Sequence, residues 1–205
     1  MEFRKEYTQR LLDCKDDVAL FGETFLDHKV HDYNEGFLNC KEKCVLYRSG
    51  RKVGKSTSAA VKTLHFAWFA PFLLKTVRDR CDIVIVSVTQ QQADIMMDLI
   101  KDQLGRSKAM QSYIMKNNAG ELWIRFINGG GYSRIYTRAA GEQGTSLRGY
   151  IPHVVIVDEV GFVKEKVLVA LLPAGIATDA RYWLVGTPFG KSGYCLLYTS
   201  PSPRD

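Results

Sequence analysis

The sequence predicts an α/β fold with a mostly parallel sheet that helices cover on both faces. Apolar runs with strand character alternate along the chain with segments of helical periodicity. This alternation favours crossover helices, and therefore parallel strands. Residues 82–88 and 153–157 are almost continuously apolar, which is typical of strands buried on both faces. In such folds ligands bind at the carboxyl ends of the strands.

Each element has its own signal. The β-rich run at 44–49 leads into a glycine turn and then a helical pattern at 55–69. Thr89 follows the strand at 82–88 and is suited to cap a helix at 90–104. The remaining predicted elements are a hairpin pairing 121–127 with 132–138 across the turn 128–131, a strand at 153–159, a helix at 164–172 and a strand at 181–188.

Length and composition favour one domain. The 205 residues are 46% hydrophobic, which suits one α/β domain with a well-buried core. We expect it to span residues 1–194, with 1–40 as a helical lead-in. No run approaches the roughly 20 apolar residues of a membrane span. The charged N-terminus lacks a secretion signal, so we expect a soluble protein in a reducing cytoplasm, with its five cysteines as free thiols.

Positive charge is concentrated in one part of the chain. Residues 41–80 hold ten Lys and Arg against two acids, whereas the whole chain has a formal charge of +6. This local excess suits a polyanion, either nucleotide phosphates or a nucleic acid. A solvated basic surface is the alternative, and charge alone does not choose between them.

The last eleven residues, CLLYTSPSPRD at 195–205, have no periodicity of a helix or strand. They resemble one reading frame of a transposase adapter used in sequencing libraries. On that interpretation the gene fragment ends near Tyr194, and a C-terminal portion of the protein is absent. A natural disordered tail is the alternative.

The segment SGRKVGKST, residues 49–57, lies between a predicted strand and a predicted helix, where a phosphate-binding loop belongs. Such a loop needs a glycine that lets backbone N–H groups turn inward, a lysine for the β and γ phosphates and a hydroxyl for Mg²⁺. Gly54, Lys55 and Ser56 meet these needs, while Ser49 replaces the usual first glycine. The predicted phosphate-binding residues are Ser49, Gly50, Arg51, Lys52, Val53, Gly54, Lys55, Ser56 and Thr57.

Arg51 and Lys52 are unusual inside such a loop, since two adjacent cations must either face phosphate or repel each other. Arg51 could stabilise charge on the γ phosphate from within the same subunit. A solvated side chain on the loop is the alternative.

Two adjacent carboxylates, Asp158 and Glu159, end a buried strand about 100 residues after the loop. Asp158 is predicted to hold Mg²⁺ together with Ser56, and Glu159 to polarise the attacking water as general base. Both motifs must then face the same triphosphate, and we expect them at neighbouring strand tips.

These motifs resemble those of terminase large subunits, the packaging enzymes of tailed viruses. The likeness covers roughly residues 30–194. It rests on the glycine-poor loop with an internal arginine and on three further segments in the family's order. Those segments are VSVTQQQADIMMDLI (86–100), with Gln92 at the motif's glutamine, TSLRGYIPHVVIVDEVGFV (145–163) and the coupling motif LVGTPFGKSGY (184–194).

The resemblance implies a RecA-like ATPase domain that hydrolyses ATP with Mg²⁺ and drives double-stranded viral DNA into a procapsid. It also implies a portal protein, a small terminase subunit and a homo-oligomeric ring as partners, in the host cytoplasm. Thr187 would sense the γ phosphate, and Arg148 would act in trans on a neighbouring subunit. Asn34 stands where the family usually has a glutamine near adenine, which puts adenine contacts in doubt. The family's nuclease domain is expected to be absent from this chain.

Other interpretations remain at this stage. A helicase-like nucleic-acid translocase would use the same ATPase core, and a non-catalytic nucleotide- or DNA-binding module would bind without turnover. A zinc site at His28, His31, Cys40 and Cys44 has suitable ligand types, but its spacing fits no common finger. Cys44, at the start of a strand, is expected to point into the core instead.

Overall fold

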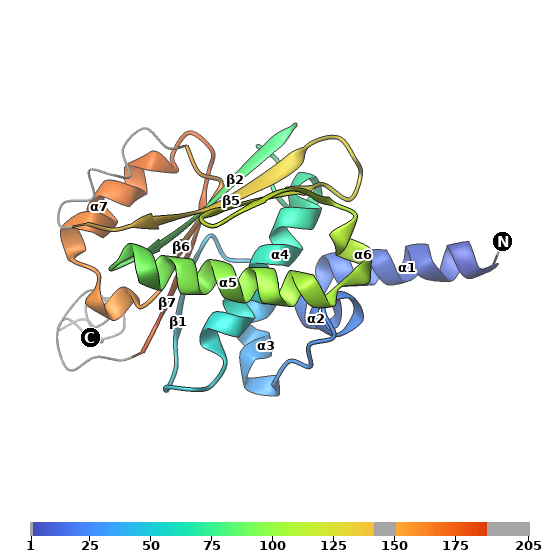
Figure 1. The fold of residues 1–205 in the computed structure, drawn as a ribbon, viewed down its shortest axis with the longest axis horizontal. Helices are drawn as coiled ribbons and strands as arrows, with labels where there is room; N and C mark the ends of the chain where they lie inside the picture. The colour runs from blue at the N-terminus through green and yellow to red at the C-terminus, as the bar shows by residue number, and fades with distance from the viewer. Residues whose placement is uncertain (1, 142–150, 188–205) are drawn as a thin grey trace, which may run out of the picture.

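In the computed structural model, residues 2–141 and 151–187 are described, and they form one seven-stranded sheet with helices around it (Figure 1). The strands are β1 (Cys44–Arg48), β2 (Arg80–Ser87), β3 (Ile114–Asn118), β4 (Glu121–Arg125), β5 (Tyr132–Ala139), β6 (Val154–Val157) and β7 (Arg181–Gly186). The helices are α1 (Glu2–Asp16), α2 (Val18–Phe25), α3 (Asp32–Leu38), α4 (Lys55–Leu73), α5 (Gln90–Arg106), α6 (Lys108–Gln111), the 3₁₀ turn η2 (Val160–Phe162) and α7 (Glu165–Ala174).

The strand order is β1-β7-β6-β2-β5-β4-β3. The first five strands in this order pair in parallel, whereas β4 and β3 add an antiparallel extension at one edge. The predicted mostly parallel sheet is therefore confirmed. The carboxyl ends of β1, β7 and β6 share one edge, where ligands bind in folds of this kind.

Alternate residues of the central strands face two separate apolar clusters. Ile83 and Ile85 of β2 belong to a cluster with α1, α2, α4 and α5, while Val84 and Val86 belong to one with η2 and α7. All four side chains are 2% exposed or less. Helices thus cover both faces, as the apolar runs predict, because a strand enclosed on two sides has no solvent-facing positions.

Helix α4 is longer than its sequence pattern predicts. It continues to Leu73 and holds Pro71 in its last turn. A proline lacks the N–H that would bond the carbonyl four residues earlier, that of Ala67. The Ser133 hydroxyl of β5 donates to this Ala67 oxygen at 2.7 Å, so a neighbouring strand satisfies the group that the proline leaves unpaired. The predicted cap of α5 is confirmed, since Thr89 Oγ1 accepts from the Gln92 N–H at 3.2 Å.

One strand has no signal in the sequence, and one expectation is wrong. The polar segment Ile114–Asn118 forms edge strand β3 by pairing with β4. Cys44 does begin β1, but its side chain is exposed because it is the first residue of an edge strand. Among the described residues, no helix combines the length and apolarity that crossing a bilayer requires.

Candidate functional site

The loop between β1 and α4, predicted to bind phosphate, contains two residues with positive φ. Gly54 precedes the helix with φ of 79°, in the left-handed region that favours glycine, and Lys52 also has a positive φ of 61°. Lys55 begins α4 and is 8% exposed. Its Nζ donates to the carbonyl oxygen of Ser49 at 3.1 Å and to that of Gly50. The ammonium group therefore lies inside the loop, and the loop leads into a 19-residue helix whose first N–H groups lack partners within the helix.

The acidic pair lies directly after β6. The backbone N–H of Asp158 donates to the Val86 carbonyl at 2.9 Å, which extends the parallel ladder by one residue and fixes this backbone. Glu159 has φ of 51° and ψ of 45°, a left-handed conformation that turns the chain into η2. The Oε2 atom of Glu159 is buried and has no hydrogen-bond partner among the described residues.

Burial, with a further contribution from the adjacent Glu159 carboxylate, raises the pKa of Asp158 to about 6. The Lys55 ammonium acts in the opposite direction and lowers the same pKa, which puts the lysine and the aspartate within electrostatic reach of each other. The two predicted motifs are thus brought together. A site that raises a carboxylate's pKa in this way favours a cation or proton beside it.

Strand β7 lies between the two motif-bearing strands. The expectation of neighbouring strand tips is wrong, since β1 pairs with β7 and β7 pairs with β6. The tip of β7 is itself part of the site: the Ser49 N–H donates to the Gly186 carbonyl at 3.4 Å, and Thr187 follows. A Cβ on Gly186 would lie 3.1 Å from the backbone nitrogen of Val160, so the small residue lets η2 and the acidic turn pack close to β7.

An open cavity of about 550 Å³ lies at these strand ends. Its volume is within the usual range for small-molecule sites. It is lined by Arg51, Lys52, Gly54, Lys55, Ser56, Thr57, Glu159 and Thr187. Cations, helix N-terminal N–H groups and hydroxyls thus face a carboxylate across one space. This combination suits a polyphosphate with a divalent cation.

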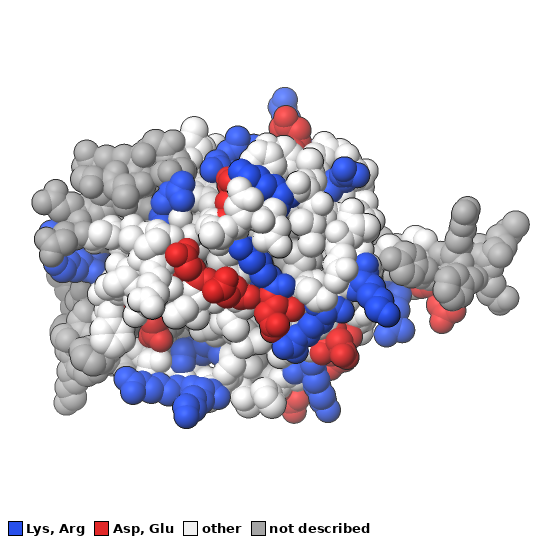
Figure 2. Space-filling model, viewed as in Figure 1, with Lys and Arg blue, Asp and Glu red and all other residues white. Residues whose placement is uncertain are grey.

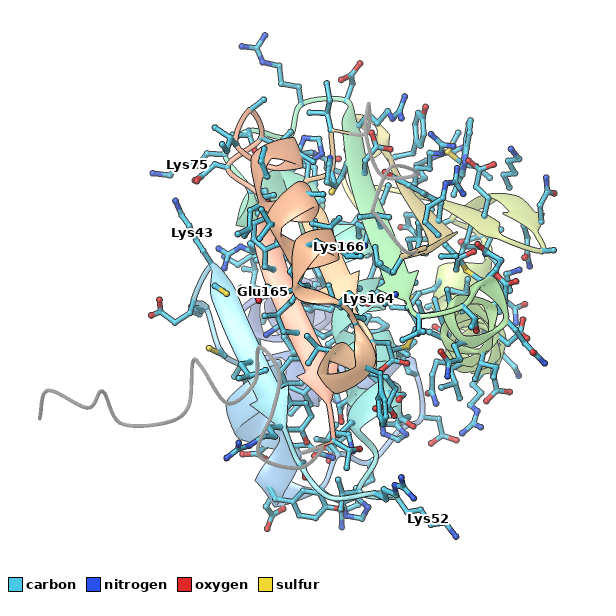
Figure 3. All side chains as sticks on the ribbon, turned by 90° about the vertical axis from the view of Figure 1, so that its left-hand side faces the viewer. Lys43, Lys52, Lys75, Lys164, Glu165 and Lys166 are labelled. Atoms are coloured by element: carbon cyan, nitrogen blue, oxygen red, sulfur yellow. The ribbon has the colours of Figure 1, made fainter. Side chains whose placement is uncertain are left out.

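The loop residues differ in their surroundings: some side chains are exposed, and some carbonyl groups accept hydrogen bonds. Arg51 and Lys52 are exposed at the cavity rim, and Figure 2 shows basic side chains gathered over the turn between β1 and α4. In Figure 3 the Lys52 side chain extends away from the ribbon. The Ser49 and Gly50 carbonyls hold Lys55, and the Val53 carbonyl has a partner outside the loop. Arg148 lies outside the described residues.

Asn34 makes a contact with the loop that its sequence pattern does not predict. Asn34 of α3 is 3% exposed, and its Nδ2 donates to the Val53 carbonyl at 3.3 Å. Its Oδ1 accepts from the Tyr47 hydroxyl of β1. The sequence offers one signal: Asn34 lies three and four residues before the apolar Phe37 and Leu38, so a helix would place all three on one face.

The zinc hypothesis gains no geometric support. Among residues 2–141 and 151–187, no group of three or more His, Cys, Asp and Glu side chains is arranged to hold a metal ion. The cysteines in this part of the chain, Cys14, Cys40, Cys44 and Cys81, are free thiols.

No protein-family model matches the sequence, and no curated protein matches it either. Solved structures do match. The ATPase domain of the Thermus phage P74-26 large terminase has a TM-score of 0.63 and 22% identity, over 80% of this chain and 67% of that one. The HK97 bacteriophage large terminase has a TM-score of 0.70 and 18% identity, over 90% of this chain but 40% of that one. The large terminase of thermophilic bacteriophage D6E, solved in complex with ADP, has a TM-score of 0.59 and 15% identity, over 74% of this chain and 36% of that one.

These neighbours share the mixed α/β architecture across most of the described sheet and helices. At 15–22% identity the likeness concerns the fold. The chain therefore has the RecA-like fold of a phage large-terminase ATPase domain.

Proposed function

We propose that this chain binds ATP with Mg²⁺ and hydrolyses it, as the motor part of a terminase large subunit. The observation that carries the proposal is the shared cavity, in which Lys55 and Ser56 from α4, Glu159 after β6 and Thr187 after β7 meet at one edge of the sheet. A chance match of short sequence motifs does not require this convergence. The D6E large terminase, which has a similar fold, was solved with ADP and with ATP-γ-S.

The residues divide the chemistry. The backbone N–H groups at the start of α4 and the Lys55 ammonium bind the β and γ phosphates. Glu159 orients the attacking water and accepts its proton, because it lines the cavity and its Oε2 has no hydrogen-bond partner among the described residues. Thr187, at the tip of the intervening strand, senses the γ phosphate. Arg51 stabilises charge that develops on it from the cavity rim.

The residues present fit a magnesium ion. Mg²⁺ prefers oxygen ligands and is usually held by one or two protein groups together with phosphates and waters. The Ser56 hydroxyl and the Asp158 carboxylate are the groups that would hold it, and a nearby cation would offset the burial that raises the pKa of Asp158. When bound, the ion neutralises charge on the phosphate oxygens.

The proposed motor role also requires a substrate and partner proteins. The substrate is double-stranded viral DNA, the partners are a portal protein and a small terminase subunit, and the place is the cytoplasm of an infected host. The chains form a ring in which Arg148 of one subunit enters the site of the next. Support comes from the shared fold and from the order of the four sequence segments.

Phosphate release from ATP tests the enzymatic part of the proposal. We expect Mg²⁺-dependent release from the 205-residue chain, stimulated at high protein concentration if ring contacts contribute. Glu159→Gln should lower the rate by roughly 100- to 10,000-fold, the usual contribution of a general base, while ATP binding persists. Lys55→Ala should weaken binding itself.

Ser112→Ala is a suitable matched control, because Ser112 is an exposed residue directly after α6 and does not line the cavity. ATP binding with no turnover at any protein concentration would favour a non-catalytic module. If the wild-type protein binds ATP no better than Lys55→Ala does, the site assignment is wrong.

A further inference from the structure

Asn34 connects three segments that are distant in sequence. It sits on α3, and its side-chain amide lies between β1 and the phosphate loop. The Nδ2 donates to the Val53 carbonyl at 3.3 Å, and the Oδ1 accepts a hydrogen bond from the Tyr47 hydroxyl. The residue is 3% exposed. Both ends of this buried amide form hydrogen bonds, and losing either bond would leave a buried polar group without a partner. That loss is unfavourable, so the two hydrogen bonds fix the orientation of the Asn34 side chain.

The contact falls at the point where the loop needs its left-handed turn. Val53 immediately precedes Gly54, whose φ is 79°. A Cβ built on Gly54 would lie 3.5 Å from Asn34 Nδ2, so the amide packs directly against this turn. The orientation of the Val53–Gly54 peptide sets where the following N–H groups point. Asn34 therefore acts on the part of the loop that faces phosphate.

Helix α3 is itself held by the helix that the loop starts. Lys62 of α4 is fully buried, and its Nζ donates to the carbonyls of Phe37 at 2.6 Å and Cys40 at 3.0 Å. The Phe37 ring stacks on the Tyr47 ring with centroids 4.4 Å apart. Helix α3, which carries Asn34, is thus attached to both elements that flank the loop, β1 before it and α4 after it.

We propose that Asn34 is a positioning residue that sets the conformation of the phosphate loop through Val53, and that it does not read the adenine base. The inference rests on the proposed nucleotide site. Both ends of its amide are engaged by the protein itself, and burial keeps the side chain from a ligand in the cavity. Its effect should therefore fall on the triphosphate and be independent of the base.

The test removes the Val53 hydrogen bond without adding charge. Asn34→Leu alone also leaves the Tyr47 hydroxyl unpaired, so the informative comparison is the double variant Asn34→Leu/Tyr47→Phe against Tyr47→Phe. These two proteins differ in the Asn34 amide but share the phenyl ring at position 47 that stacks on Phe37. Dissociation constants are measured for ATP, GTP and tripolyphosphate with Mg²⁺, together with hydrogen exchange of the nucleotide-free proteins.

We expect the double variant to bind all three ligands about tenfold more weakly than Tyr47→Phe, with an unchanged ratio of ATP to GTP affinity. Amides of residues 51–57 should exchange faster, whereas those of β6 should not, since a general loss of stability would speed both. A fall in the ATP to GTP ratio would identify Asn34 as a base-reading residue. Equal affinities and equal loop exchange would overturn the positioning role.

Failure of the proposed function gives a different pattern. In that case the Tyr47→Phe protein and the wild-type protein both bind none of the three ligands. The exchange of residues 51–57 in the nucleotide-free variants still decides whether Asn34 holds the loop.

Discussion

At the scale of single residues, Asp158 and Glu159 both adopt energetically unfavourable states. Glu159 adopts a left-handed backbone conformation that costs a non-glycine residue on the order of 1 kcal/mol, and its Oε2 is buried without a partner among the described residues. Asp158 beside it is a half-buried carboxylate, and this partial burial raises its pKa to about 6. Such unfavourable arrangements persist where a ligand compensates them, which agrees with a cation and a polyphosphate in the cavity.

Asp158→Asn should therefore stabilise the fold while it abolishes ATP hydrolysis. The folded-state pKa of Asp158 is above the unfolded value of 3.8, so the ionised carboxylate destabilises the protein fully above pH 6. This penalty disappears as the pH falls below 3.8. We expect the variant to gain on the order of 1–3 kcal/mol of unfolding free energy at pH 8. Urea denaturation with EDTA at about pH 8 and pH 4 measures the difference, and an equal gain at both pH values would contradict this origin.

At the scale of elements, a neighbouring helix or strand supplies the hydrogen-bond partners that a segment lacks. Helix α4 keeps its last turn despite Pro71 because Ser133 of β5 bonds the Ala67 carbonyl. Strand β4 is polar at its start, and Glu121 there bonds Lys116 of β3 and Arg134 of β5. These cross-element hydrogen bonds link local sequence choices to the sheet order.

The pairing of Ser133 with Pro71 predicts a coupling that a double-mutant cycle can measure. Ser133→Ala should lower the unfolding free energy by about 1–3 kcal/mol, since it leaves the buried Ala67 carbonyl unpaired. In a Pro71→Ala background the residue at position 71 has an N–H for that carbonyl. The same Ser133→Ala change should then cost less. Equal costs in both backgrounds would show that the hydroxyl serves another purpose.

The Glu121 cluster predicts acid sensitivity. Burial alone would raise the pKa of Glu121, but hydrogen bonds from Lys116 and Arg134 outweigh it and lower this pKa to about 2. Its stabilising contribution is therefore complete above pH 4.5 and is lost as the pH falls toward 2. Glu121→Gln should cost roughly 1 kcal/mol at pH 7, with the difference from wild type shrinking across that window. Denaturation curves at about pH 7, 4 and 2.5 measure it.

At the scale of the whole molecule, the strand that leads into the candidate phosphate-binding loop, β1, lies at an edge of the sheet. β1 pairs with β7 alone among the described strands, and the loop that follows it closes against the rest of the site. Figure 1 shows α1 extending from the body at the opposite end from this loop. In Figure 2, acidic side chains lie along α5, apart from the basic turn at the site. On this face, basic side chains thus gather at the turn between β1 and α4, and acidic ones lie along α5.

Ligand binding at that edge should stabilise the entire fold. A ligand that binds the native state at 100 times its dissociation constant adds about 2.7 kcal/mol. We expect ATP with Mg²⁺ to raise the Tm of the wild-type chain by roughly 5–10 °C under those conditions. Lys55→Ala should show little shift at the same ATP concentration. A similar rise in both proteins would place ATP at a different site.

Most strands and helices around the candidate site could be predicted from sequence patterns. Continuous apolar runs predict β2 and β6. The residue types of Gly54, Lys55 and Ser56 predict a phosphate-binding loop between a strand and a helix. These features are local, because periodicity, a left-handed turn and a helix N-terminus depend on a few consecutive residues. The polar sequence of β3 does not predict a strand, because pairing with β4 rather than its own pattern makes it one.

Which strand tips meet could be learned from the three-dimensional arrangement alone. No local pattern states that β7 inserts between β1 and β6, or that this brings Thr187 to the same cavity as Lys55 and Glu159. Nor does the sequence show that Asn34 bonds Val53, since that contact requires α3 to dock against β1 and the loop. The physical reason is common to both cases: strand order and helix docking follow from the burial of apolar surface between segments distant in sequence, which single-segment patterns do not contain.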